Sequence, residues 1–134
     1  MEIKQKLLGE KDGVIYHFIH NENGRFMINA TDIAKSFNIN LSEFLEKEET
    51  KLWIECLLKK DKAPVRYKVD GEEYESTIDR NYKLEDVILI DNGIYYFGKL
   101  LTYELCKPLG FFYWWMDGLF YELMKKDTNG LMYF

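Results

Sequence analysis

The sequence has little cysteine and little proline, and neither is arranged as in a structural scaffold. Its only cysteines, Cys56 and Cys106, stand alone in apolar surroundings. This excludes a disulfide-dense scaffold and the paired cysteine spacing of structural zinc sites. We expect both to be buried small hydrophobes rather than a disulfide. With two prolines, nine glycines and no Pro/Gly/Ser-rich stretch, the chain has no predicted linker or internal domain boundary.

Long apolar runs are also missing. The most apolar stretch, residues 109–124, is too short to span a bilayer and carries Asp117 and Glu122. The N-terminal residues are charged and lack the apolar segment of a secretory signal peptide. The sequence therefore predicts a cytoplasmic protein without a membrane partner.

Signatures of catalysis are absent from the sequence. There is no phosphate-binding loop, no dinucleotide fingerprint and no Ser/His/Asp arrangement. His17 and His20 are three apart on a predicted strand, so they point to opposite faces and make a poor metal pair. Asp32 with residues 49–51 imitates a nuclease pattern, but it falls on helix ends without strand context. We expect no enzyme, no cofactor, no metal and no small-molecule substrate.

The net charge of −5 argues against a strongly basic nucleic-acid binder. Most of that charge comes from residues 66–91, which hold eight acidic and four basic residues. The rest of the chain is nearly balanced, so a local basic face remains compatible with the sequence. The acidic segment itself is interpreted as a solvated loop or, alternatively, as a partner-binding or DNA-mimicking surface.

What the sequence does contain is enough apolar material for one core. Hydrophobic residues make up 47% of the 134 positions and aromatic residues 16%, which predicts a single domain over residues 1–134. We place its core at 14–124 and a C-terminal tail at 125–134. The polar run 72–86 is expected to be a long loop or an irregular hairpin. Predicted strands are 14–19, 25–28, 65–69, 87–90 and 94–97, and predicted helices cover 29–37, 41–47, 50–60, 99–106 and 109–126.

The order of these elements predicts an α+β, winged-helix-like domain. A helix, a short break and a second helix fill residues 30–48, and strands follow near 65–69 and 87–97. In a winged helix-turn-helix the first helix braces the second, which enters the major groove, while a β-hairpin contacts the backbone.

A family resemblance points the same way. The core Ile-Asn-Ala-Thr-Asp-Ile-Ala-Lys at 28–35, within residues 25–37, resembles the Asn-Ala-Thr signature of the KilA-N domain. Residues 44–51, residues 93–97 and Lys107-Pro108 resemble later parts of that family in order and spacing. The family occurs in phages, large DNA viruses and prophages and is related to the fungal APSES domain. The resemblance implies a double-stranded-DNA-binding viral protein that regulates transcription in the cytoplasm or nucleoid of a host cell.

The predicted DNA-facing residues lie around the two helices and on the expected wing. They are Lys35, Ser36, Asn38, Asn40, Ser42, Lys47, Lys51, Arg66 and Lys68. The chain departs from the family at Glu46, where an arginine is common, and Glu43, Glu48 and Glu49 add further repulsion toward phosphates. The alternative is therefore a KilA-N-derived protein that has lost DNA binding and engages a protein partner, as an antirepressor or an inhibitor of a host system.

The last predicted helix is apolar almost all round. Such a helix is buried in a core or in an interface. We expect a homodimer or a protein partner to cover part of it, through Phe111, Trp114, Trp115 and Phe120.

Overall fold

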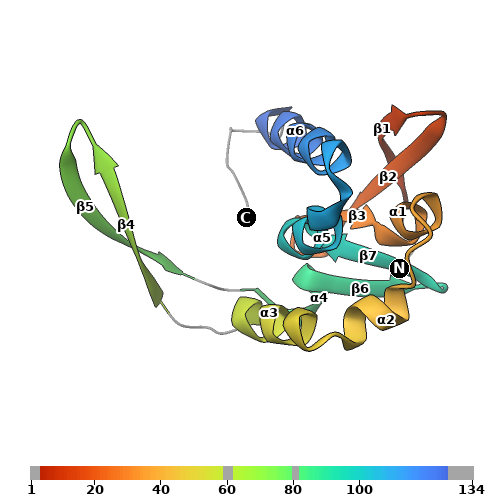
Figure 1. Ribbon diagram of the computed structural model, residues 1–134, viewed down its shortest axis with the longest axis horizontal. Helices are drawn as coiled ribbons and strands as arrows, with labels where there is room; N and C mark the ends of the chain where they lie inside the picture. The colour runs from red at the N-terminus through yellow and green to blue at the C-terminus, as the bar shows by residue number, and fades with distance from the viewer. Residues whose placement is uncertain (1–3, 59–61, 80–81, 127–134) are drawn as a thin grey trace.

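The protein, described here from a computed structural model, has an α+β fold, as the sequence predicts (Figure 1). The structure describes residues 4–58, 62–79 and 82–126. The strands are β1 (Lys6–Lys11), β2 (Val14–His20), β3 (Phe26–Asn29), β4 (Lys62–Val69), β5 (Glu72–Asp79), β6 (Ile88–Asp91) and β7 (Ile94–Gly98). The helices are α1 (Ala30–Ser36), α2 (Leu41–Glu46), α3 (Glu48–Leu58), α4 (Leu84–Val87), α5 (Lys99–Cys106), the short 3₁₀ helix η1 (Lys107–Leu109) and α6 (Phe111–Lys126).

Five of the strands form one antiparallel sheet in the order β1-β2-β3-β7-β6. The turns at Asp12-Gly13 and Asn92-Gly93 join the sheet's β1–β2 and β6–β7 hairpins, and both residues of each turn have positive φ. This is the backbone of a type I′ turn, which Asp-Gly and Asn-Gly favour. The sequence prediction omitted β1, although Asp12-Gly13 already carried the signal.

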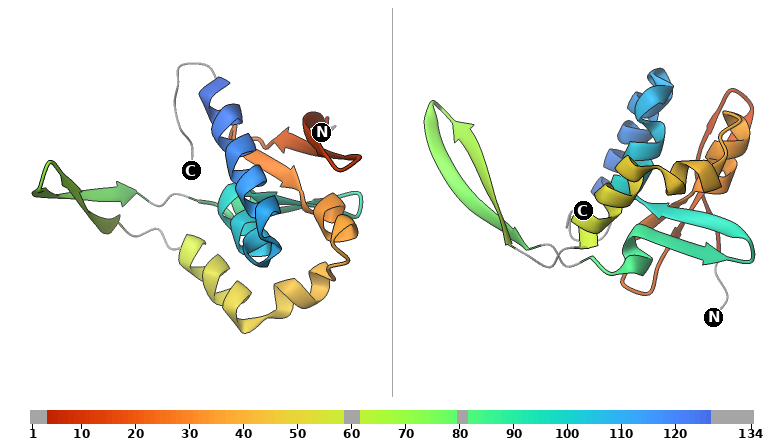
Figure 2. Two further views of the ribbon diagram at one scale, coloured as in Figure 1. Left: turned by 45° about the horizontal axis from the view of Figure 1, so that its top comes forward. Right: turned by 60° about the horizontal axis from the view of Figure 1, so that its bottom comes forward.

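The strands β4 and β5 form a separate two-stranded hairpin. It closes on Asp70-Gly71, again with positive φ at both residues, and pairs regularly from Lys62↔Asp79 to Val69↔Glu72. The prediction of a loop or irregular hairpin at 72–86 was therefore wrong over β5. Acidic residues are uncommon in strands, so the composition of β5 did not indicate a strand, although its partner β4 and the turn that joins them are adjacent in the sequence. Figures 1 and 2 show this hairpin projecting away from the five-stranded sheet and its helices.

The main core lies between one face of the sheet and helices α5 and α6. Phe97, Leu101, Met116 and Phe120 are at most 1% exposed. The opposite face holds a smaller buried cluster of Ile19, Met27 and Tyr96. The side chains of Phe97 and Tyr96 fall in different clusters because successive residues of a strand point to opposite faces.

Other features of the fold bear on the sequence predictions. Neither cysteine forms a disulfide, as predicted, but Cys56 is exposed and only Cys106 is buried. The sequence predicted that the first helix of the pair braces the second. In the structure, α1 packs chiefly on β7 and α2 packs on α3, so contact between the two helices is not the main contact of α1. The fold is thus a five-stranded antiparallel sheet with several helices. Within the described residues, no helix has both the length and the apolar character needed to cross a membrane.

Candidate nucleic-acid interface

The segment that resembles the family signature anchors α1 to the sheet. Asn29 is 3% exposed and its side-chain oxygen accepts a hydrogen bond from the Asp32 amide at 3.1 Å, which caps the helix. The Thr31 hydroxyl accepts a hydrogen bond from the Tyr95 amide at 2.9 Å and so ties α1 to β7. The side-chain oxygens of Asn29 and Thr31 therefore both accept backbone hydrogen bonds that stabilise the fold.

A tight turn joins α1 to α2. Asn38 has a φ of 54°, the left-handed conformation that ends many helices and that asparagine tolerates. The Ile39 amide donates to the Ala34 carbonyl at 2.8 Å, which is the six-residue bond of a Schellman motif. Asn40 then caps α2 by accepting from the Glu43 amide at 3.2 Å. These local bonds fix where α2 begins.

The residues around this turn offer polar groups to solvent. A groove of about 430 Å³ runs beside the turn, and Lys35 is the only charged residue that lines it. Asn38 lines the same groove, and Gly93 and Tyr95 form its other wall. All seven predicted DNA-facing residues on this segment are exposed: Lys35, Ser36, Asn38, Asn40, Ser42, Lys47 and Lys51.

Charges of both signs line a second groove of this segment. It has a volume of about 520 Å³ and lies between α2 and α5, and Lys47 and Lys107 line it together with Glu43, Glu49 and Glu104. Carboxylates therefore share this groove with the basic residues. The electrostatically favourable part of the interface for phosphate is the end of α1 near Lys35.

The two basic residues of the expected wing lie far from this turn. The β4–β5 hairpin projects at the end of the molecule opposite α1 in both Figures 1 and 2. The register pairs Arg66 with Glu75 and Lys68 with Glu73. The Lys68 Nζ lies 3.9 Å from a carboxylate oxygen of Glu73. The hairpin therefore opposes its basic positions with acidic ones.

The four aromatic residues expected at an interface separate into two groups on α6. Phe111 is 88% exposed and Trp114 is 72% exposed. Trp115 is half-buried and its ring contacts Tyr16, while Phe120 is 1% exposed and belongs to the core. The burial of Phe120 follows from the helical period, because it shares the core-facing side of α6 with Met116.

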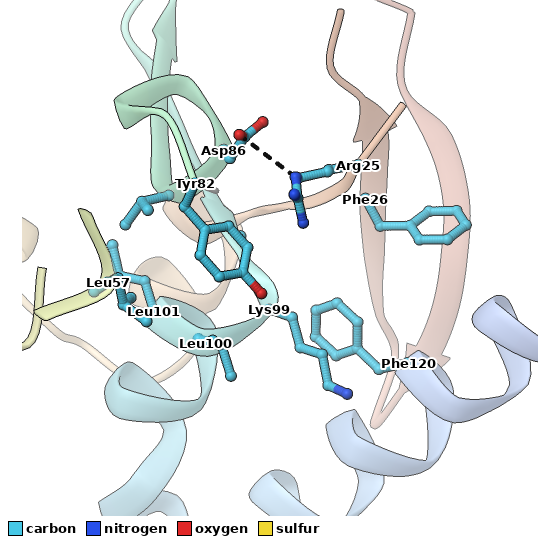
Figure 3. A pocket seen from close by; sticks show the side chains of 11 residues that line it. Arg25, Phe26, Leu57, Tyr82, Asp86, Lys99, Leu100, Leu101 and Phe120 are labelled. Atoms are coloured by element: carbon cyan, nitrogen blue, oxygen red, sulfur yellow. Dashed lines mark ion pairs between the residues drawn. The ribbon is translucent and has the colours of Figure 1, made fainter. Parts of the chain in front are cut away.

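A second cluster of charged side chains, which the sequence analysis missed, lines a narrow pocket between β3, α4 and α5 (Figure 3). Asp86 is 4% exposed and accepts hydrogen bonds from Asn21 at 2.7 Å, from Asn23 at 2.9 Å and from the Lys83 amide at 2.9 Å. Arg25 Nε lies 3.4 Å from Oδ2, the oxygen that also accepts from the Lys83 amide. Asn21, Asn23 and Arg25 come from a distant part of the chain, so no local spacing in the sequence announces their contact with Asp86.

Burial and hydrogen bonding oppose each other at this cluster. Burial alone would raise the pKa of Asp86, but the bonds from Asn23, Lys83 and Asn21, with the Arg25 charge, hold that pKa below its ordinary value. Burial raises the pKa of Tyr82, whose ring lies under the Arg25 guanidinium. The carboxylate is thus ionised and hydrogen-bonded at both oxygens, so this cluster stabilises the fold.

Among the residues that the structure describes, no group of three metal-ligating side chains comes together. No protein-family model matches the chain, and neither a curated protein nor a solved structure is significantly similar to it. Support for a nucleic-acid interface therefore comes from the exposure, charge and backbone geometry of the α1–α2 turn.

Proposed function

We propose that the protein binds double-stranded DNA through the exposed surface around the α1–α2 turn, as a KilA-N-like regulator would. The observation that carries the proposal is the set of exposed short polar side chains around this turn, Ser36, Asn38, Asn40 and Ser42, of which Asn38 lines the same groove as Lys35. Side chains of this kind hydrogen-bond to base edges and phosphates, and lysines supply the salt-dependent part of the affinity.

The local rigidity of the turn supports this function. The caps at Asn29 and Asn40 fix the residues at which α1 and α2 begin, and the left-handed Asn38 fixes the backbone of the turn between the two helices. Side chains held in this way lose less conformational freedom when they bind. The Asn40 oxygen is used by the cap, which leaves its amide nitrogen as the group directed to a ligand.

We limit the proposed phosphate contacts to the surface around the α1–α2 turn and α3. Arg66 and Lys68 oppose glutamates on a distant hairpin, so the proposal assigns phosphate contacts to Lys35, Lys47 and Lys51. Three contacts predict a slope of roughly −2.7 for log affinity against log salt concentration. Non-specific affinity of this kind falls in the range of about 1–100 µM.

Fluorescence anisotropy with a mixed-sequence duplex at low salt tests the proposal. Lys35→Ala and Lys47→Ala should each weaken binding and flatten the salt slope by about one. Lys6→Ala is the matched control, because Lys6 is an exposed lysine on the edge strand β1. No binding at tens of micromolar protein, or equal effects of all three substitutions, would refute the proposal.

A charge reversal gives a sharper comparison. Glu46 is exposed on α2, so Glu46→Lys should convert repulsion into a phosphate contact and tighten binding. Glu10→Lys changes the net charge equally from an exposed position on β1. A larger gain at Glu46 than at Glu10 supports the proposed surface. Equal gains would show that only the total charge matters.

The second candidate function is binding of a protein partner without DNA, as an antirepressor or inhibitor would do. It is favoured by the acidic residues in and beside the groove at Lys47, namely Glu43, Glu48 and Glu49. A basic protein surface would be attracted to them, and phosphates would be repelled. The absence of salt-dependent DNA binding in the experiment above favours this function over the first.

A further inference from the structure

The outward face of α6 carries an aromatic stripe. We define it as Phe111, Trp114, Gly118 and Tyr121, which follow one another at helical spacing and so lie on one side of the helix. The three aromatic side chains are 88%, 72% and 59% exposed. The opposite side of α6 is buried in the core through Phe112, Met116 and Phe120. The stripe is thus a second apolar face, separate from the core face.

The middle of the stripe is open. A Cβ atom built on Gly118 would meet no other atom within 4 Å. Glycine within a helix costs roughly 0.5–1 kcal/mol relative to alanine, and no side chain in the part of the chain that the structure describes fills the gap that it leaves. The stripe therefore presents a gap between two large rings, Trp114 and Tyr121.

The spacing of the stripe is the same in both directions along the helix. Its intervals are three, four and three residues, from Phe111 to Trp114, to Gly118 and to Tyr121. In an antiparallel pair of such helices, with a two-fold axis level with residue 116, the indole of Trp114 faces Gly118 of the second copy. Phe111 then faces Tyr121 of the second copy. Every large side chain meets either the gap or another ring.

We propose that the aromatic stripe is the contact surface of a symmetric dimer of this chain, with α6 packed antiparallel against α6 of the second copy. A two-fold interface must be complementary to itself, and the palindromic spacing satisfies that condition. The pairing also brings Glu122 level with the first turn of the opposite α6, where a carboxylate is favourable.

The area fits a weak but specific dimer. From their exposed fractions, the three rings present roughly 400–500 Å² per copy, since a buried aromatic side chain contributes about 150–250 Å². If all of this area is covered, two copies bury about 800–1,000 Å², which reaches the lower bound of specific interfaces, so we expect a weak dimer with a dissociation constant in the micromolar range. The indole of Trp114 at the centre is the type of residue that dominates such interfaces.

Sedimentation equilibrium of the full 134-residue chain tests the dimer. The wild type should approach twice the 16.1 kDa mass of the chain as its concentration rises from about 5 to 500 µM, around the expected dissociation constant. Trp114→Ala should weaken the dimer roughly 100-fold or more, because the symmetric interface loses the residue twice. Leu52→Ala is the control, since Leu52 is an exposed apolar residue on α3 that lies outside the stripe. A monomeric wild type, or equal effects of the two substitutions, would overturn the proposal.

A complementary pair of variants separates the interface from a folding defect. Gly118→Trp should abolish the dimer, because two introduced indoles would collide with Trp114 of the other copy, while the open space at Gly118 leaves the monomer fold unchanged. When Gly118→Trp is mixed with Trp114→Ala, a heterodimer should form, since each indole then meets a small residue. Failure of the mixture to associate refutes the antiparallel pairing. Protection of the Trp114 indole in a monomeric protein would instead assign the stripe to other residues of the same chain, and would overturn the dimer.

Discussion

Replacing Asp86 with alanine should be among the most damaging single changes in the protein. The carboxylate is 4% exposed, accepts three hydrogen bonds and lies 3.4 Å from the Arg25 Nε. Alanine leaves the guanidinium and the amides of Asn21 and Asn23 without this acceptor. Removing one partner of a buried ion pair costs about 3–5 kcal/mol. Here part of that cost falls on the Asn21 and Lys83 donors, because the Arg25 side chain is itself 22% exposed. That is a large part of the roughly 5–15 kcal/mol by which native domains are stable.

Thermal unfolding followed by circular dichroism measures this cost. For a chain of this size, about 4 kcal/mol corresponds to a fall in melting temperature of roughly 10–20 °C. Glu85→Ala is the matched control, because Glu85 is the neighbouring carboxylate on α4 and its side chain is exposed. Its substitution should change stability by about 0.5 kcal/mol or less. Similar melting temperatures for the two variants would refute the structural role given to Asp86.

The stability difference between the wild type and Asp86→Ala should depend on pH, in a direction set by the lowered pKa of Asp86. The folded-state pKa of Asp86 is lowered, so its stabilising contribution is complete above the unfolded value of about 3.9. That contribution is lost as the pH falls through the folded pKa. The gap in stability between wild type and Asp86→Ala should therefore be constant from about pH 5 to 7 and shrink below about pH 4. A gap that widens in acid would contradict an ionised, hydrogen-bonded carboxylate.

Three further predictions concern single positions. Gly98→Ala should destabilise the fold by about 1–3 kcal/mol or more, because the new Cβ would collide with the Asp86 carbonyl oxygen. Urea unfolding measures this loss of stability, and an unchanged midpoint would contradict the close approach. Asn29→Ala should cost about 1 kcal/mol through the lost helix cap, and no change in melting temperature would remove that role. In the native protein a thiol reagent should label the exposed Cys56 but not Cys106, since burial raises the pKa of Cys106 to about 12; labelling of both before unfolding would show that Cys106 is accessible.

The parts of the fold that the sequence predicted are those decided by local chemistry. Asn29 and Asn40 cap helices as their positions indicated, since a cap needs only a side-chain oxygen and the next turn of backbone. Asn92-Gly93 turns a hairpin because both residues accept positive φ. The strand β5 was missed because its side chains are largely acidic, although Asp70-Gly71 supplied the turn.

The candidate interface could be predicted only in part. The exposure of Asn38 and Ser42 follows from a short polar turn between two apolar helical faces. The position of Arg66 opposite Glu75 depends on strand register, and the presence of Glu104 and Lys47 in one groove depends on how α2 and α5 are placed in the fold. Charge along the sequence does not reveal which charges become neighbours in space, and electrostatic energy depends on those distances.

By itself the sequence determined an α+β fold, the starts of α1 and α2, the turn between β6 and β7 and the apolar character of α6. Each of these is settled within a few residues, by allowed backbone angles, local hydrogen bonds or composition. Only the tertiary structure decided that Asp86 meets Asn21 and Arg25, residues more than sixty positions away. It also decided which side of α6 the core covers, since Phe120 and Trp114 are equally apolar in sequence. The physical reason is that burial and pairing depend on which distant segments pack together, and no local pattern encodes that choice.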